Sequence, residues 1–207
     1  DVGPPGSQEV PNLVAVVHAW RLPADGSGSA GTPGVRGDPE GDALGGQPRV
    51  VVARQGPDPL QPPGEHNDPE TAYRRISGSG RTLAELLMDQ TVVAGVGNIY
   101  RCEVLWRHRL HPLRPGRSLK RASWQLGWDD LVRLMPWGVR TGSIITLDDV
   151  LVDTAAAWER GERPQVPREF AVYQRTGLPC LRCGATVRHK VVAGRNLFWC
   201  GGCQRRT

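Results

Sequence analysis

Residues 180–203 read CLRCGATVRHKVVAGRNLFWCGGC, and their four cysteines have the spacing C-x2-C-x16-C-x2-C. Two such pairs are typical of a structural zinc site, in which four thiolates surround one Zn²⁺ ion. Glycines beside each pair allow the backbone to curl around a metal. The sequence therefore predicts one bound zinc ion and a small β-hairpin with strands over 186–192 and 197–199. The expected ligands are Cys180, Cys183, Cys200 and Cys203.

Two disulfide bonds are the alternative use of these cysteines, because a secreted protein could pair them. We do not expect a secretory leader, since the apolar run over 13–17 is short and ends in His18. We therefore favour zinc. Few apolar residues lie nearby, so metal binding, which contributes about 10 to 16 kcal/mol, would have to hold this segment together. The fifth cysteine, Cys102, is interpreted as a small buried hydrophobic residue.

The segment 174–207 carries only positive charge, with six arginines, one lysine and no acidic residue. A zinc tetrathiolate of about minus two would leave it cationic. The whole chain of 207 residues has a net charge of +5 and a pI of about 9.3. This balance suggests nucleic acid or an acidic surface as the partner. Since no apolar run has the length of a membrane span, we expect a soluble protein with no membrane partner.

The first 48 residues are rich in Gly, Pro, Ser and Asp and show no extended helical or strand periodicity. A short strand is possible over 50–52. Helix signals follow: Asp68 is the expected N-cap of a helix with Pro69 in its first turn. Thr82 and Glu85 predict a capping box for a second helix, which we expect to end near Gln90.

Residues 95–98 read GVGN and connect that helix to another one, for which Asn98 is the expected N-cap. Backbone N–H groups at a helix start can bind an anion, and Gly97 would let the anion come close because it has no side chain. The alternative is an ordinary turn in which Gly97 and Asn98 only join two helices. The apolar positions of the following helix are Ile99, Cys102, Leu105 and Trp106.

A regular apolar stripe predicts one long helix, which we expect Pro136 to stop. The stripe consists of Trp124, Trp128, Leu131 and Met135. A last helix is expected over 147–159. Its inward residues would be Leu151, Ala155 and Trp158. Tryptophans could also be platforms for stacking bases, but the helical spacing favours core positions.

The run LLMDQTVVAGVGNIYRCEVLWRHRLHP (86–112) resembles the helix-two-turn-helix of the formamidopyrimidine-DNA glycosylase and endonuclease VIII family. The run VYQRTGLPCLRCGATVRHKVVAGRNLFWCGGCQ (172–204) resembles the zinc finger of that family, and AGRNLFWC is closer to the endonuclease VIII branch. The resemblance implies a mainly α fold with a small β part. Its expected domains are a degenerate, disordered remnant of a β-sandwich over 1–55, a helix-two-turn-helix domain over 56–165 and a zinc-ribbon β-hairpin finger over 170–207.

The resemblance also implies roles for three DNA-binding residues. In the family, the asparagine of the GxGN turn holds a phosphate next to the lesion, which here is Asn98, with the amide of Gly97 beside it. The arginine at the hairpin tip grips the flanking phosphates, which here is Arg195. The planar guanidinium suits this task because it can bridge two phosphate oxygens. The alternative for Arg195 is a solvated turn residue.

Catalysis in the family begins by flipping the damaged base and attacking the sugar C1′ with an N-terminal proline that precedes a glutamate. This sequence begins Asp1-Val2 instead. The internal pair Pro39-Glu40 is rejected as a catalytic site, because the nitrogen of Pro39 is a delocalised amide. The family's hairpin lysine has no counterpart before Lys120. We therefore assign no catalytic residue and interpret the catalytic domain as missing or scrambled.

Two functions remain open from the sequence. The resemblance implies a base-excision repair DNA glycosylase with abasic-site lyase activity, expected to be a monomer with damaged or abasic duplex DNA as its partner, in the cytoplasm at the nucleoid. The alternative is a catalytically inactive, zinc-dependent DNA-binding module. A zinc ribbon that binds RNA or another protein is a third, more remote hypothesis.

Overall fold

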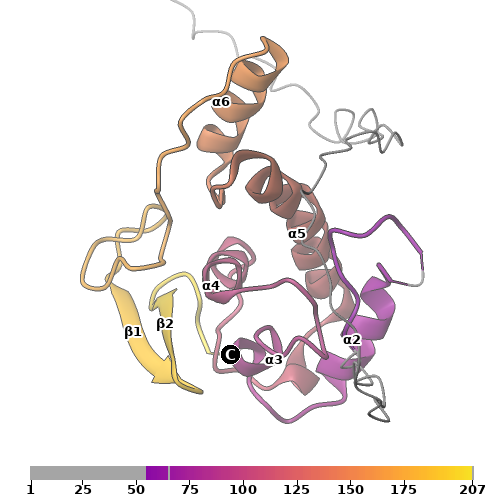
Figure 1. Ribbon diagram of the computed structural model, residues 1–207. Coiled ribbons are helices and arrows are strands. Elements are labelled where there is room, and N and C mark those ends of the chain that lie inside the picture. The colour runs from indigo at the N-terminus through magenta and orange to yellow at the C-terminus, as the bar shows by residue number, and fades with distance from the viewer. Residues whose placement is uncertain (1–54, 65, 207) are drawn as a thin grey trace, which may run out of the picture. The chain divides into compact units, whose positions relative to one another are not determined.

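The computed structural model describes residues 55–64 and 66–206 (Figure 1). The interpretation of 1–55 as a remnant, the strand over 50–52 and the pair Pro39-Glu40 fall outside the described residues, apart from residue 55. The elements in chain order are α2 (Pro69–Ser77), α3 (Leu83–Leu86), α4 (Asn98–Arg107), the 3-10 helix η1 (Gly116–Ser118), α5 (Arg121–Thr141), α6 (Asp148–Glu159), β1 (Val187–Val192) and β2 (Arg195–Cys200). The expected class, mainly α with a small β-hairpin, is confirmed.

The expected helix starts are confirmed at α2 and α3. The carboxylate of Asp68 accepts the N–H of Glu70, and Thr82 and Glu85 form a reciprocal capping box. The predicted end of α3 near Gln90 is wrong, because the helix ends at Leu86. The side chain of Gln90 instead closes the following loop, donating to the carbonyl of Val96 and accepting the N–H of Gly95.

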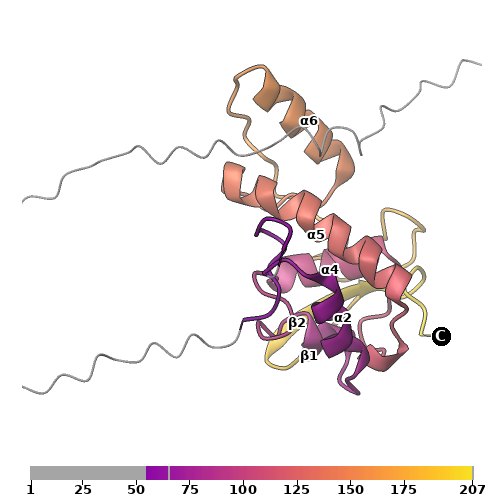
Figure 2. The ribbon, with the colours of Figure 1, turned by 90° about the vertical axis from the view of Figure 1, so that its right-hand side faces the viewer.

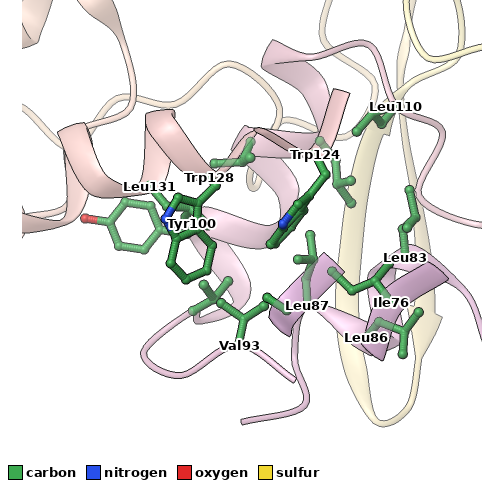
Figure 3. Packing of buried hydrophobic residues seen from close by; sticks show 14 of the residues in the cluster. Ile76, Leu83, Leu86, Leu87, Val93, Tyr100, Leu110, Trp124, Trp128 and Leu131 are labelled. Carbon is green, nitrogen blue, oxygen red and sulfur yellow. The ribbon is translucent and has the colours of Figure 1, made fainter. Parts of the chain in front are cut away.

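The main hydrophobic core lies between α2, α4 and α5 (Figures 2 and 3). The predicted stripe of α5 is confirmed as core, since all four of its members are buried: Trp124, Trp128, Leu131 and Met135. The indole N–H of Trp124 donates to the carbonyl of Pro69 at 2.7 Å, and that of Trp128 donates to Asn67 Oδ1 at 3.2 Å. These two rings are therefore buried in the core and are not accessible for stacking on bases.

The prediction that Pro136 stops this helix is wrong, because α5 continues to Thr141 and ends at Gly142 with a positive φ of 69°. Proline removes one helical N–H donor, but tertiary packing outweighs that loss: Trp137, beyond the proline, packs against the main core. In α6 the predicted inward set is only partly right. Leu151 is buried, whereas Ala155 and Trp158 are half-buried, and Thr154 and Ala157 face inward instead.

The hairpin pairs β1 and β2 in antiparallel register, from Val187 opposite Cys200 to Val192 opposite Arg195. Its turn consists of Ala193 and Gly194 only, both with positive φ, as expected for a tight two-residue hairpin loop. Strand β2 therefore begins at Arg195, two residues earlier than predicted. A second hydrophobic cluster joins β2 to α3 and α4 through Leu197, Ala84 and Cys102.

The helical domain and the finger thus share a core within one compact unit, Val51–Thr207. Cys102 is buried, as expected, and this burial raises the pKa of its thiol. Among the described helices, none combines the length and apolar character needed to cross a membrane.

A half-buried ionic cluster links the end of α4 to α5 and α6. Asp130 accepts from Arg107 Nε at 2.6 Å and lies 2.8 Å from His108 Nε2. Arg133 bridges Asp130 and Asp148. Burial by itself would raise the pKa of Asp130, but hydrogen bonds from His108 and Arg107 outweigh it and hold the pKa well below its usual value.

Asp130→Asn should destabilise the protein by about 3 kcal/mol at neutral pH, because it removes one partner of a largely buried ion pair. Since the folded-state pKa is depressed, the stabilisation by Asp130 is present above the unfolded-state pKa and is lost as pH falls through the folded-state pKa. The free energies of unfolding of the wild type and of Asp130→Asn, measured with urea, should therefore differ most near pH 7 and become equal in acid. Asp129→Asn, on the exposed neighbour, is the control. Equal losses for the two variants would contradict this assignment.

Candidate zinc centre and nucleic-acid interface

The four predicted metal ligands meet at one point, with their Sγ atoms all within 4.8 Å of one another. Cys180 Sγ and Cys203 Sγ are 3.8 Å apart, and Cys183 Sγ and Cys200 Sγ are 3.5 Å apart. A tetrahedral zinc ion with bonds of about 2.3 Å requires sulfur separations of about 3.8 Å. Disulfide bonds would require about 2.05 Å, and all five cysteines are free. The site therefore fits one structural zinc ion.

Hydrogen bonds to sulfur support the thiolates. Cys180 Sγ accepts from the indole Nε1 of Trp106 at 3.3 Å and from the backbone N of Arg182 at 3.4 Å. Cys200 Sγ accepts the backbone N–H groups of Gly202 and Cys203, each at 3.3 Å. Such outer contacts orient metal ligands and favour their ionised form.

The zinc site also holds the C-terminal end of α4. The guanidinium of Arg182 lies 4.1 Å from the ring centroid of Trp106 and donates to the carbonyls of Trp106 and Arg107. These carbonyls belong to the last turn of α4, where helical partners are missing. The first Cys pair and the helix end therefore stabilise one another.

The N-terminal end of α4 carries the predicted phosphate-binding residues. The N-cap is Gly97, and Asn98 is the first residue of the helix, so the prediction that Asn98 caps it is wrong. The described residues offer no side-chain cap to this helix start. A Cβ placed on Gly97 would find no atom within 4 Å. The space beside Gly97 is therefore open, so an anion could approach the start of the helix there.

The side chain of Asn98 contacts the hairpin tip instead of its own helix. Asn98 Nδ2 donates to the carbonyl of Asn196 at 2.9 Å, and Asn98 Oδ1 accepts from Arg101. Arg195 directly precedes Asn196 and is exposed, and its guanidinium has no hydrogen-bond or ion-pair partner among the described residues. The structure therefore places the turn that contains Gly97 and Asn98 beside the hairpin residue that follows Arg195. The specific role of each in binding DNA stays a prediction.

A buried carboxylate holds the chain segment that leads into the finger. Glu103, on α4, is fully buried and accepts the backbone N–H groups of Ala171, Val172 and Tyr173, each at 2.9 Å. It also accepts the hydroxyl of Thr146 at 3.1 Å. Tyr173 then stacks edge-on against Phe198 of β2. The finger is thereby oriented by α4 as well as by its metal.

Sequence reasoning missed Arg101, Glu103 and Trp106 as functional residues. Arg101 and Glu103 are charged residues inside a helix that otherwise has apolar neighbours, and both are fully buried. A charged residue among apolar helix neighbours indicates a buried polar interaction, since burial of a charge is costly unless the charge has partners. This pattern could have identified Arg101 and Glu103 in the sequence. Trp106 was assigned to the apolar face, which is correct, but its bond to Cys180 could not be inferred from spacing.

Two parts of the chain match known family patterns. Residues 55–149 match the formamidopyrimidine-DNA glycosylase H2TH domain, and residues 177–206 match the zinc finger found in FPG and IleRS. The first range contains Gly97 and Asn98. The second range contains Arg195 and all four zinc ligands.

Endonuclease 8 1 of Mycobacterium tuberculosis (strain ATCC 25618 / H37Rv) is 45% identical over 159 residues, which are 77% of this chain and 56% of that protein. Formamidopyrimidine-DNA glycosylase of Bdellovibrio bacteriovorus is 37% identical over 156 residues, 74% of this chain and 53% of that protein. The chain thus spans about half the length of the curated relatives it matches. The higher identity to Endonuclease 8 1 agrees with the branch inferred from AGRNLFWC.

Solved structures of similar fold include MutM (Fpg) from Thermus thermophilus, with a TM-score of 0.57 and 34% identity over 77% of this chain and 57% of that one. The complex of Lactococcus lactis Fpg with DNA containing an abasic site has a TM-score of 0.56 and 28% identity, over 74% of this chain and 52% of that one.

Purified protein should contain one zinc ion per chain, which metal analysis can measure. Cys183→Ala should lower this stoichiometry because it removes a ligand, whereas Cys102→Ala should leave it unchanged because Cys102 is not a ligand. Chelation should unfold the hairpin, seen as a loss of near-ultraviolet circular dichroism from Trp199 and Trp106. The far-ultraviolet helix signal should largely persist, because the main core does not include the metal site. Complete loss of that signal would contradict this view.

Glu103→Gln should destabilise the protein by about 2 to 3 kcal/mol. The carboxylate of Glu103 accepts the backbone N–H groups of residues 171–173, whereas the NH₂ group of a glutamine amide cannot accept a hydrogen bond. Urea unfolding followed by circular dichroism measures this loss. Glu159→Gln, at the exposed end of α6, should change the free energy of unfolding little. A similar small effect for Glu103→Gln would show that the buried carboxylate does not hold the segment 171–173.

Proposed function

Because this chain belongs to the formamidopyrimidine-DNA glycosylase and endonuclease VIII family, we propose that it acts in base-excision repair as a DNA glycosylase with abasic-site lyase activity. In this proposal the described residues form the part that binds damaged or abasic duplex DNA at the nucleoid. The observation that carries the proposal is the contact of Asn98 with Asn196, 98 residues apart, which joins the GxGN turn to the arginine tip.

The start of α4 suits a DNA phosphate for two reasons. The N–H groups of its first turn and the positive end of the helix dipole both favour an anion. In addition, Asn98 uses one N–H of its amide group on Asn196, which leaves the second N–H for a phosphate oxygen. The open space beside Gly97 allows the close approach that such a contact requires.

Arg195 extends the same surface from the other side. Arg195 follows a two-residue turn and therefore lies at the tip of the hairpin. The other end of this hairpin is held by the four zinc ligands. A planar guanidinium can engage two phosphate oxygens at once. Asn98 and Arg195 would therefore contact successive phosphates of one strand, which supports binding to the backbone without reading base sequence.

Glycosylase chemistry requires that the damaged base leave the stack, at a cost of a few kcal/mol. Phosphate contacts on both sides of the lesion would stabilise the strand in that distorted conformation. The lyase step needs an amine that attacks the sugar C1′ and then allows elimination. Pro39 cannot supply this amine, because its nitrogen is a delocalised amide.

The second candidate is a zinc-dependent module that binds abasic DNA without cutting it, which rests on the described residues alone, since these include the four-cysteine cluster and the GxGN turn. Borohydride trapping on a duplex with an abasic site separates the two. A covalent adduct with strand cleavage supports the enzyme, and retained binding without an adduct supports the module. Equal affinity for abasic duplex and single-stranded RNA would contradict both.

Arg195→Ala should weaken binding to abasic duplex DNA and reduce the salt dependence of that binding. Each lost phosphate contact lowers the slope of log K against log salt by roughly 0.9. Fluorescence anisotropy over a series of salt concentrations measures both quantities. Arg160→Ala is the control, because this exposed arginine pairs with Glu162 beyond α6. An unchanged slope in Arg195→Ala would remove Arg195 from the interface.

A further inference from the structure

Arg101 is a buried cation that has no carboxylate partner in the part of the chain that the structure describes. Its residue is 0% exposed, and its hydrogen bonds go to three neutral acceptors: the carbonyl of Ala84, Asn98 Oδ1 and the carbonyl of Asn196. Its Nε atom has no hydrogen-bond partner within the described residues. Arg107, the half-buried arginine at the end of α4, pairs with Asp130 and Asp148 instead. The arginine near the start of α4 therefore donates to neutral acceptors, whereas the arginine at its end is paired with two carboxylates.

Burying a charge without a counter-charge is expensive, so an unpaired arginine at this position needs a compensating interaction. Burial lowers the pKa of Arg101, and the charge of Arg195 acts in the same direction. A guanidinium nevertheless keeps its proton under all ordinary conditions. Positive charge from Arg101, from Arg195 and from the start of α4 therefore accumulates at one place, and a bound anion there would balance it.

The contacts of Arg101 also orient the amide of Asn98. Arg101 donates to Asn98 Oδ1, so this oxygen points inward and Nδ2 points toward the hairpin tip. The same Nη2 atom donates to the carbonyl of Asn196 at 3.2 Å. One nitrogen therefore connects the GxGN turn with the residue that follows Arg195. Without it, the amide of Asn98 could rotate and present its oxygen to a phosphate.

We propose that Arg101 is a positioning residue of the phosphate-binding site: it fixes the donor face of Asn98, ties it to the hairpin tip, and contributes a buried positive charge that the DNA phosphate balances. This inference rests on the proposed binding of abasic DNA. It assigns Arg101 no direct contact with DNA.

A double-mutant cycle tests the proposal, with a duplex that contains a tetrahydrofuran abasic-site analogue as the probe and anisotropy as the readout. Arg101→Met and Asn98→Ala should each weaken binding by about tenfold or more, as expected for loss of a charge-assisted contact. The double variant should lose less affinity than the sum of the two single losses, because Arg101 acts largely through Asn98. Additive losses would overturn the proposal, as would wild-type affinity in Arg101→Met.

The conservative variant gives a second readout. Both acceptors at the tip, Asn98 Oδ1 and the carbonyl of Asn196, share Nη2, so a single ammonium group can serve them. Arg101→Lys should therefore recover most of the affinity that Arg101→Met loses. A merely structural role, set by the shape of the side chain, would not produce this recovery. If Arg101→Met does not fold, Arg101→Gln replaces it in the cycle. The proposal is then overturned if Arg101→Lys binds the probe no better than Arg101→Gln.

Arg107→Met is the matched control, since it removes a half-buried arginine from the opposite end of α4. It should lower the free energy of unfolding by breaking the pair with Asp130, while the folded protein keeps its affinity for DNA. If the wild-type chain does not bind the probe, the proposed function fails and this inference with it. If the wild type binds and Arg101 variants bind equally well, only this inference fails.

Discussion

The attachment of α4 to the finger at both ends is the constraint on which the rest of the structure depends. At the start of the helix, Asn98 donates to the hairpin tip at Asn196. At its end, Trp106 donates to the zinc ligand Cys180, and Arg182 covers the last carbonyls. Because a helix is rigid, these contacts fix the distance and orientation of the tip relative to the GxGN turn.

Buried polar groups make this attachment specific. An apolar interface alone would tolerate a small slide of the hairpin along α4, whereas Glu103 accepts three consecutive backbone N–H groups at one register only. Burying such a group is costly unless every bond is made, so a shifted register would be strongly disfavoured. The shared core of Leu197, Cys102 and Ala84 supplies the apolar burial that accompanies these bonds.

Several elements were predictable because the signals are local. The Asp68 cap, the Thr82–Glu85 capping box and the tryptophan stripe of α5 depend on neighbours within one or two helical turns. The errors arose where distant contacts decide. Helix α5 continues past Pro136 because Trp137 packs on the core, and Asn98 does not cap α4 because its side chain bonds to Arg101 and Asn196.

The sequence by itself determined the four candidate metal ligands and the charge of this protein, because cysteine spacing and residue type are local properties, whereas the sulfur separations of the folded chain decided against disulfide bonds. It also located the GxGN turn and the arginine after the hairpin turn as separate motifs. Only the tertiary structure decided that these motifs meet, since the contact between residues 98 and 196 depends on how the finger packs on α4. For the same reason only packing could show Arg101 as a buried charge with no carboxylate partner among the described residues.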